Sequence, residues 1–343
     1  MWIKDLELKY FRNYGELKKK FDRQTTVLVG PNAVGKTNVL EAIYLLATGE
    51  SFRAEKIEEI VNWQAEVAHI TGLVGDKQLQ VRLTRGEVQG KRTVKRAFKV
   101  NGVARRKMDF LGNLRAVIFR PEDLEIVTDS PTMRRRFLDG ILTQVDTEYR
   151  RSLVSYEKAL RRRNRLLSLI QEEEVSRTTL AFWDQLLIKE GDVLLNRRRE
   201  LIEFINGQPK IESNRWLVYD YSAISEARLK QYAEEEVAAG YTLVGPHKDD
   251  FRVMADRDLA IYGSRGQQRM GVLWLKVEEM NFVEAKTGER PVLLLDDIFS
   301  ELDEAHDRVV LGLLGKQQTI ITTTEVAGKF KESADLAIER LNL

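Results

Sequence analysis

The stretch "TTVLVGPNAVGKTNVLEAIYLL", residues 25–46, decides the fold of this chain. Its first five residues, "TTVLV", predict a buried strand that ends at Gly30, and its last nine, "NVLEAIYLL", carry apolar residues at helical spacing. The intervening "GPNAVGKT", residues 30–37, matches the pattern G-x-x-x-x-G-K-[ST] in full. A strand, this loop and a helix in that order predict a nucleotide phosphate site on an α/β core.

The residue types in this loop suit phosphate chemistry. Gly30 and Gly35 let the backbone curl so that successive N–H groups point at the phosphates. Lys36 can reach the β- and γ-phosphates, and the Thr37 hydroxyl can ligate Mg²⁺. A chance glycine-rich turn is the weaker alternative because motif and flanks both match. The predicted nucleotide-binding residues of the loop are Gly30, Pro31, Asn32, Ala33, Val34, Gly35, Lys36, Thr37 and Asn38.

A second stretch, "VLLLDDIFSELD" at residues 292–303, ends an apolar run with two carboxylates. The run predicts a buried parallel strand, and Asp296 and Asp297 follow at its carboxyl end, where α/β ligand sites lie. One carboxylate there can hold Mg²⁺, and its neighbour can orient and deprotonate an attacking water. A helix-capping or solvated pair of acids is the alternative, and the phosphate loop makes it the weaker one.

A third stretch, "AIYGSRGQQRMGVLWLKVEEM" at residues 260–280, combines a turn with a helix. We expect a short strand at Leu259 and Ile261, a turn through Ser264 and Gly266, and then the helix. A serine and two glycines at a helix N-terminus can hold an anion on free backbone N–H groups. One chain would then carry two elements that face phosphate.

The composition limits the possible functions. The chain has 343 residues and a formal net charge of +2, so it can form a sizeable core and shows no overall polyanion-binding charge. It has no cysteine, which excludes disulfides and thiolate metal sites, and its three histidines are too scattered to suggest a zinc site. His247 is best explained as a hydrogen-bonded histidine in a structural turn. No apolar run approaches about 20 residues, so we expect no membrane association and a cytoplasmic location.

The pattern along the chain predicts a core that is split in sequence. Residues 1–120 predict strands around one early helix, with an antiparallel sheet over 67–104 and a type I′ hairpin turn at "VNGV", residues 100–103. Two amphipathic runs, about 146–171 and 179–206, predict a helical hairpin. The chain then closes with an apolar strand, a helix, the strand "QTIITTT" and a final short helix.

One segment is strongly basic and contains no acid, residues 91–107. Such a hairpin is poor core material and suits contact with a DNA phosphate backbone, with a merely solvated hairpin as the alternative. The predicted DNA contacts are Lys91, Arg92, Lys95, Arg96, Lys99, Arg105 and Arg106. The Arg triplets 134–136, 161–163 and 197–199 are better explained as solvated helix faces, because adjacent helical residues point about 100° apart.

Together these motifs resemble the ABC-type ATPase heads, and within that superfamily the sequence is similar to the RecF family of bacterial recombination-mediator ATPases. The similarity extends over nearly the whole chain in family-like order. The stretches that carry it are "FRNY" (11–14), "GPNAVGKTN" (30–38), "FRPEDLEIVTDSPTMRRRFLD" (119–139), "TLVGPHKDD" (242–250), "SRGQQR" (264–269) and "LLLDDIFSELD" (293–303).

The resemblance implies the fold class, an α/β ABC-type P-loop ATPase head whose mixed sheet core has an antiparallel β subdomain and an inserted helical lobe. Residues 1–120 together with 286–343 would form lobe I. Residues 121–285 would form helical lobe II, with the signature motif at its C-terminal end. The two long helices are far shorter than the coiled coils of SMC proteins, so the chain corresponds to a head without an arm.

The resemblance also implies residue roles. Ser264 in the signature turn would act in trans, on a nucleotide bound by a second subunit, with Gly266 and Gln267 beside it. Asp296 would be the Mg²⁺-associated acid. Asp297 would be the catalytic carboxylate, and because many heads have glutamate there, its shorter side chain suggests slow turnover.

Other family elements are matched less completely. Arg12 and Asn13 belong to a motif that lies near the nucleotide in related heads, with an ordinary strand-end turn as the alternative. "SELD", residues 300–303, matches the loop that crosses the dimer interface. Threonines 322–324 stand where many relatives have a switch histidine, and no convincing glutamine-loop residue is found near 119–125.

The function implied by the resemblance is an ATP-dependent DNA-binding protein of recombinational repair and replication restart. ATP and Mg²⁺ would drive a homodimer onto double-stranded DNA with gaps or single-strand junctions, and slow, DNA-stimulated hydrolysis would release it. Mediator proteins of the RecO/RecR type would be partners in loading recombinase. The alternative is a nucleotide-gated protein scaffold, or another SMC-like ABC ATPase head, with incidental DNA binding.

Overall fold

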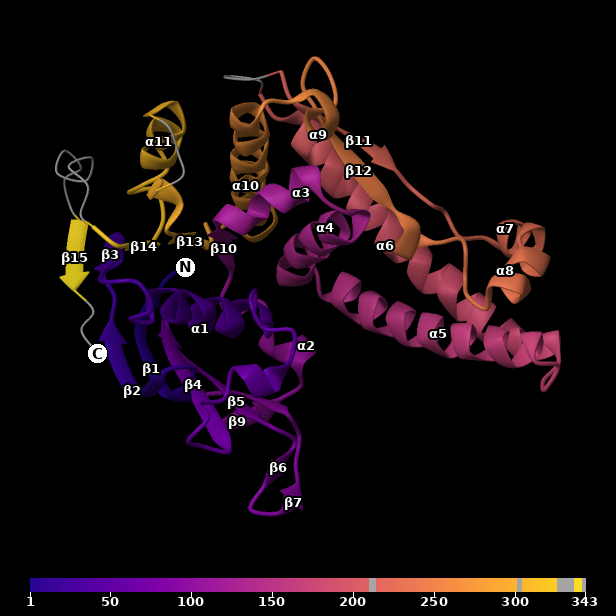
Figure 1. Ribbon diagram of the computed structural model, residues 1–343, viewed down its shortest axis with the longest axis horizontal. Helices are drawn as coiled ribbons and strands as arrows, with labels where there is room; N and C mark the ends of the chain where they lie inside the picture. The colour runs from indigo at the N-terminus through magenta and orange to yellow at the C-terminus, as the bar shows by residue number, and fades with distance from the viewer. Residues whose placement is uncertain (210–213, 301–303, 326–335, 341–343) are drawn as a thin grey trace. The chain divides into compact units, whose positions relative to one another are not determined.

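The computed structural model describes residues 1–209, 214–300, 304–325 and 336–340 (Figure 1). The chain divides into two compact units, one of Met1–Asp123 with Leu273–Leu343 and the other of Leu124–Val272. Helix α10 (Arg265–Thr287) runs through the second point of division. The lobe boundaries expected at 120/121 and 285/286 stay a prediction.

A parallel sheet of five strands forms one layer of the first unit. Its order is β10 (Ala116–Phe119), β13 (Val292–Asp296), β14 (Thr319–Thr323), β3 (Thr25–Val29) and β15 (Leu336–Arg340). The first four strands are buried along their whole length, as expected for parallel strands covered on both faces. The strands predicted at both motifs are thus confirmed, whereas residues 336–340 form a strand where a closing helix was expected.

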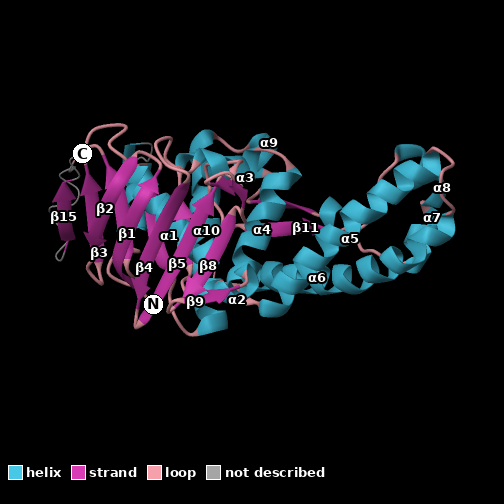
Figure 2. Ribbon diagram, turned by 90° about the horizontal axis from the view of Figure 1, so that it is seen from below, coloured by secondary structure: helices cyan, strands magenta, loops and turns pink. Residues whose placement is uncertain are grey.

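An antiparallel sheet of six strands forms the other layer (Figure 2). Its order is β2 (Tyr14–Lys20), β1 (Ile3–Phe11), β4 (Val67–Val74), β5 (Lys77–Thr84), β8 (Arg96–Val100) and β9 (Val103–Arg105). Asn101 and Gly102 join the last two strands with φ angles of 50° and 77°, as the predicted type I′ turn requires. A small hairpin of β6 (Glu87–Val88) and β7 (Lys91–Arg92) branches off between β5 and β8.

Helix α1 (Lys36–Thr48) lies between the two sheets (Figure 1). Its side chains Val39, Leu40 and Ile43 join one apolar core with residues from both sheets. This packing holds the first turn of α1, and with it the phosphate loop, at the carboxyl end of β3. The unit also contains η1 (Ile57–Glu59), α2 (Lys107–Phe110), η5 (Ile298–Ser300) and α11 (Glu304–Leu311).

Two long helices dominate the second unit, α5 (Thr147–Gln171) and α6 (Ala181–Gly207), and they confirm the predicted hairpin. Gly191 lets a loop approach α6 closely, because a Cβ there would lie 2.6 Å from Ile224. Two strands of the unit, β11 (Trp216–Asp220) and β12 (Asp250–Met254), pair antiparallel. The shorter elements are α3 (Glu125–Thr128), α4 (Pro131–Val145), η3 (Arg177–Leu180), α7 (Glu226–Gln231), α8 (Ala233–Ala239), η4 (Pro246–Lys248) and α9 (Leu259–Tyr262), whereas η2 (Pro121–Leu124) spans the first point of division.

Each arginine triplet has one buried member, which corrects the expectation of solvated faces. Arg163 pairs with Glu236 at 2.7 Å, and Arg198 pairs with Asp249 at 2.9 Å. Arg134 is buried in the same way. Because neighbouring helical residues point about 100° apart, one of three adjacent arginines faces the interior, where carboxylates must compensate its charge.

His247 is a partly buried residue of the turn at η4. Its Nε2 lies 3.0 Å from the carbonyl oxygen of Thr242 and therefore donates to it. Nδ1 is then free to accept a hydrogen bond from the Tyr156 hydroxyl, 2.8 Å away. Burial lowers the pKa of His247 to about 4. This geometry agrees with the hydrogen-bonded structural histidine inferred from the sequence.

Candidate functional site

The phosphate loop follows β3 and leads directly into α1. Its bend places two residues at positive φ, Ala33 at 66° and Gly35 at 104°. No side chain fits at Gly35, because a Cβ there would lie 2.6 Å from the Tyr14 hydroxyl. The loop is also tied to β14 by the Gly30 N–H, which donates to the carbonyl of Thr323 at 3.3 Å. These contacts hold the loop in its curled form.

Lys36 begins α1 with its side chain folded back along the loop. Its Nζ donates to the carbonyl of Gly30 at 2.7 Å and to the carbonyl of Pro31 at 2.9 Å. Desolvation lowers the pKa of Lys36, while Asp297 and Asp296 act in the opposite direction. The ammonium group is therefore held at the loop, with both carboxylates close enough to favour its charged form.

Asp296 ends β13 and gathers two hydroxyl groups. Its Oδ1 accepts hydrogen bonds from Thr37 at 2.8 Å and from Thr322 at 2.7 Å. A carboxylate beside a hydroxyl fits Mg²⁺, which proteins hold through one or two carboxylates together with substrate phosphates and water. The described residues contain no cluster of three or more His, Cys, Asp or Glu side chains suited to a metal, so an ion here would need phosphate oxygens as further ligands.

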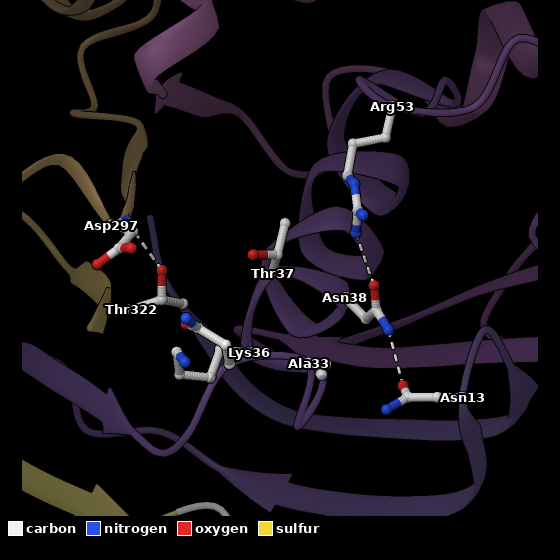
Figure 3. Close-up of a pocket in the computed structure, with 10 residues that line it drawn as sticks. Asn13, Ala33, Lys36, Thr37, Asn38, Arg53, Asp297 and Thr322 are labelled. Atoms are coloured by element: carbon white, nitrogen blue, oxygen red, sulfur yellow. Dashed lines mark hydrogen bonds between the residues drawn. The ribbon is translucent and has the colours of Figure 1, made fainter. Parts of the chain in front are cut away.

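Asp297 leaves the strand direction sharply, with a φ of 50°. Aspartate tolerates this left-handed conformation better than most residues. Its N–H lies 3.2 Å from the carbonyl and 3.1 Å from the hydroxyl of Thr322 and donates to both. The Asp297 side chain lines the same pocket as the phosphate loop (Figure 3).

The turn between β1 and β2 adds a second wall. Asn13 Oδ1 accepts from Asn38 at 2.7 Å, and Asn38 Oδ1 accepts from Arg53 at 2.9 Å (Figure 3). Arg12 instead directs its guanidinium to the buried carboxylate of Glu41, at 2.7 and 2.9 Å. Of the two predicted turn residues, Asn13 therefore lines the pocket and Arg12 anchors the turn to α1.

These elements surround a pocket of about 330 Å³ within the first unit. It is lined by Asn13, Asn32, Ala33, Gly35, Lys36, Thr37, Asn38, Arg53, Asp297 and Thr322. Its volume falls in the range of small-molecule sites. Among the residues predicted for nucleotide, Gly30 and Pro31 contribute through the carbonyls that hold Lys36, and Val34 belongs to the core.

Two pocket residues were not assigned from the sequence. In the sequence, Thr322 is noted only as one of the threonines found in place of a histidine. In the structure its hydroxyl donates to Asp296 Oδ1 and accepts from the backbone N–H of Asp297. Its place at the end of a buried strand was the available signal, because ligand sites lie at the carboxyl ends of parallel strands. Arg53 follows α1 in a loop that no motif marks.

The signature turn lies in the second unit at the start of α10. Ser264 and Gln267 form a capping box, in which the Ser264 N–H donates to Gln267 Oε1 at 2.8 Å and the Gln267 N–H donates to Ser264 Oγ at 3.3 Å. Within the described chain there is room for a side chain at position 266, since a Cβ built on Gly266 would lie 4.0 Å from its nearest neighbour, Ser264 Oγ. The predicted helix and its N-terminal turn are confirmed.

The strand expected just before this turn is wrong. Leu259–Tyr262 forms helix α9, and Asp258 caps it by accepting from the Ala260 N–H at 2.9 Å. Gly263 then lets the chain turn, because a Cβ there would lie 2.6 Å from the carbonyl oxygen of Leu259. A four-residue helix is too short to show helical periodicity in the sequence.

The basic segment 91–107 is partly neutralised by acids from elsewhere in the chain. The ion pairs are Lys95 with Glu58, Arg96 with Glu50, Lys107 with Glu50, and Arg106 with Asp109. Lys91, Arg92, Lys99 and Arg105 are exposed, and among the described residues no ion pair is found for them. The predicted DNA contacts thus fall into a paired and an unpaired group.

Residues 301–303 of the interface loop lie outside the described residues. In the segment 119–125, Asp123 is buried and accepts from Arg120 at 2.8 Å.

Within the described ranges, no helix combines the length and the apolar character needed to cross a bilayer.

A phosphate loop on a buried strand, a carboxylate pair on another parallel strand of the same sheet and a flanking antiparallel sheet define a P-loop ATPase head of the ABC and SMC type. The family model described as "RecF/RecN/SMC N terminal domain" matches residues 2–337. Within this group the chain belongs to the RecF family. Family and fold class are therefore as the sequence predicted.

Individual relatives support this assignment over nearly full length. The chain is 36% identical to the DNA replication and repair protein RecF of Lachnoclostridium phytofermentans, over 94% of this chain and 93% of that protein. The identity is also 36% to the RecF protein of Clostridium botulinum, with coverage of 95% and 94%.

Solved structures agree with this assignment. "Structure of the recombination mediator protein RecF-ATP in RecFOR pathway" is matched with a TM-score of 0.86 and 31% identity, over 95% of this chain and 93% of that one. An Smc head domain from Pyrococcus furiosus is matched with a TM-score of 0.51 and 17% identity, over 94% and 90%, and shares the fold.

Proposed function

We propose that the chain binds ATP with Mg²⁺ in the pocket of the first unit and hydrolyses it. The observation that carries this proposal is the convergence of Thr37 and Thr322 on Asp296 Oδ1, beside the phosphate loop. Lys36 would neutralise the β- and γ-phosphates, and Thr37 with Asp296 would hold the ion. Bound Mg²⁺ would supply charge neutralisation at the phosphate oxygens. A relative solved with ATP supports the choice of nucleotide.

Asp297 would orient and deprotonate the attacking water. Its side chain lines the pocket, and its backbone is fixed by Thr322. Positioning and electrostatics supply most of the catalysis in phosphoryl transfer, so a carboxylate with a fixed backbone suits this role. Its side chain is shorter than that of glutamate, which agrees with slow turnover.

ATP would also draw two copies of the chain together, so that Ser264 of one copy faces the nucleotide of the other. Ser264 is exposed at the N-terminus of α10, where backbone N–H groups and the helix dipole favour phosphate. The open space around Gly266 agrees with close approach of a ligand, with Gln267 beside it. In this scheme residues 1–120 with 286–343 form the ATPase lobe, and residues 121–285 form the lobe that carries the signature.

The dimer would act on DNA during recombinational repair and replication restart. The names of the relatives, DNA replication and repair protein and recombination mediator protein, support this role. Gapped duplexes and single-strand junctions would be its targets, and mediators of the RecO/RecR type its partners in the cytoplasm. The predicted basic residues, the unpaired ones above all, would contact the phosphates.

ATP hydrolysis with and without gapped duplex DNA at physiological salt tests this proposal. We expect DNA to stimulate turnover, and sedimentation to show a dimer on DNA only when ATP and Mg²⁺ are present. If the rate of ATP hydrolysis is the same with and without DNA, and a partner protein binds only in the presence of nucleotide, the alternative of a nucleotide-gated scaffold is favoured.

A further inference from the structure

The six-stranded sheet, whose strands are drawn in Figure 2, has an outer face with two halves that differ in charge. On β1 and β2, acids match the cations: Lys18 pairs with Glu16 at 3.2 Å and with Glu7 at 3.8 Å, and Lys9 pairs with Glu7 at 3.1 Å. Helix α1 packs against the opposite, inner face of the sheet. Ion pairing thus neutralises much of one half of the outer face.

The half formed by β4, β5 and β8 carries cations without acids. Alternate residues of these fully described strands are buried, so the residues between them face outward. The outward residues are Val67, His69, Thr71, Leu73, Gln78, Gln80, Arg82, Ala97 and Lys99. Three of these are basic, none is acidic and none is aromatic.

The pairing of the strands brings the three basic residues close together. His69 lies directly opposite Arg82, and Lys99 lies opposite Gln80, diagonal to Arg82. Like charges across neighbouring strands repel and destabilise a sheet. Partial burial, and after it Arg82, Lys9 and Lys99, lowers the pKa of His69. With its pKa lowered, His69 is mainly neutral at pH 7, so Arg82 and Lys99 carry the positive charge of this half, and no outward acid on these three strands offsets it.

We propose that the outer face of β4, β5 and β8 binds the phosphate backbone of DNA through His69, Arg82 and Lys99. The proposal rests on the proposed DNA-binding function and extends the surface beyond the segment 91–107. Thr71 and Gln80, between the cations, add neutral hydrogen-bonding groups. A basic face without acids or aromatic anchors suits a phosphate backbone better than a protein partner, whose binding hot spots are enriched in Trp and Tyr.

A pair of charge-matched variants of the full chain tests the surface. Arg82→Gln with Lys99→Gln removes two cations from the acid-free half, and Lys18→Gln with Lys20→Gln removes two from β2 on the same sheet. We expect the first variant to bind duplex DNA roughly tenfold more weakly, with a salt slope of log affinity lower by about two units. The β2 control should keep the slope of the unaltered chain. Unfolding midpoints near that of the unaltered chain would establish that both variants fold.

The titration of His69, followed by NMR in the complete chain, gives an independent measure. The charged groups that face it are Lys9 and Glu7 from β1, Arg82 from β5 and Lys99 from β8. Duplex DNA should raise the pKa of His69, because phosphates offset the repulsion from the cations. His69→Gln identifies the resonance.

The outcomes separate the two proposals. If the unaltered chain binds no DNA, the proposed function fails and this surface fails with it. If DNA binds but neither the salt slope of the Arg82 and Lys99 variant nor the His69 pKa responds, the surface alone is overturned. If polyglutamate shifts the His69 pKa and DNA does not, the face is a site for an acidic protein.

Discussion

The Thr322 hydroxyl donates to Asp296 Oδ1 at 2.7 Å, from the position in β14 that lies directly beside Asp296 in β13. The same carboxylate oxygen accepts from Thr37 of the phosphate loop, at 2.8 Å. Thr322 also accepts from the N–H of Asp297. One threonine thus positions both acids.

Thr322→Val removes the hydroxyl and keeps the shape of the side chain. We expect ATP turnover to fall roughly tenfold, about 1.4 kcal/mol in the barrier, because both carboxylates lose a positioning contact. ATP affinity should change little, since Lys36 and the loop are untouched. Single-turnover hydrolysis and nucleotide titration separate these effects. Thr322→Ser restores the hydroxyl and should recover most of the rate, and a Val variant with unchanged turnover would refute the role.

Lys36→Ala and Asp297→Asn separate binding from hydrolysis. The first variant should lose tight ATP binding, because the β- and γ-phosphates lose their cation. The second should bind ATP and stall, since an amide cannot accept the proton of the attacking water. Asparagine tolerates the left-handed backbone at 297, so the turn should persist. Asp297→Asn should accumulate as a dimer, and a monomer at saturating ATP would contradict ATP-driven association.

The paired and unpaired cations of the basic segment provide a matched comparison. Lys91→Gln with Arg92→Gln removes two exposed charges for which no ion pair is found among the described residues. Lys95→Gln with Arg106→Gln removes two charges that already pair with acids. The first variant should lower the salt slope of DNA binding by about two units, and the second should lower it less. Equal slopes in both variants would show that pairing does not select the DNA contacts.

Protonation of His247 should destabilise the second unit in acid. Its folded pKa of about 4 lies below the usual value of 6.5, so between these two pH values the unfolded chain binds more protons. The stability is complete above pH 6.5 and falls toward pH 4, by at most about 3 kcal/mol. A proton on Nδ1 would also displace the hydrogen bond from Tyr156.

Urea unfolding at pH 7, 5.5 and 4.5 measures this effect. His247→Gln should be less stable at pH 7, yet it should lose less stability on acidification than the unaltered chain. The comparison between the two chains removes the contribution of other acids that titrate in the same window. Parallel losses in both chains would assign the acid sensitivity to those other groups.

The sequence predicted what depends on local pattern. The phosphate loop and the carboxylate strand are contiguous motifs on buried strands, and the two long helices repeat their apolar spacing over many turns. It could not predict that Lys95 meets Glu58, 37 positions away, or that Arg53 reaches Asn38, because the tertiary fold creates these contacts. The role of Thr322 likewise depends on the order of strands in the sheet.

Two complementary variants test whether Ser264 acts on the nucleotide of a second copy. Ser264→Ala and Asp297→Asn should each form dimers in which both sites are impaired. In a mixed dimer, one site carries both lesions, and the other combines an intact Asp297 from one chain with an intact Ser264 from its partner. Equal mixing makes about half of the dimers mixed, each with one good site of two, so activity should recover to roughly a quarter of the unaltered level.

If Ser264 served the nucleotide of its own chain, every site in every dimer would carry one lesion, and mixing would restore nothing. Strong coupling between the two sites could hide the recovery in steady-state rates, so single-turnover hydrolysis should be followed together with subunit exchange. Mixing each variant with the unaltered chain controls for exchange. Once exchange is established, activity no greater than the average of the two variants would count against a shared site.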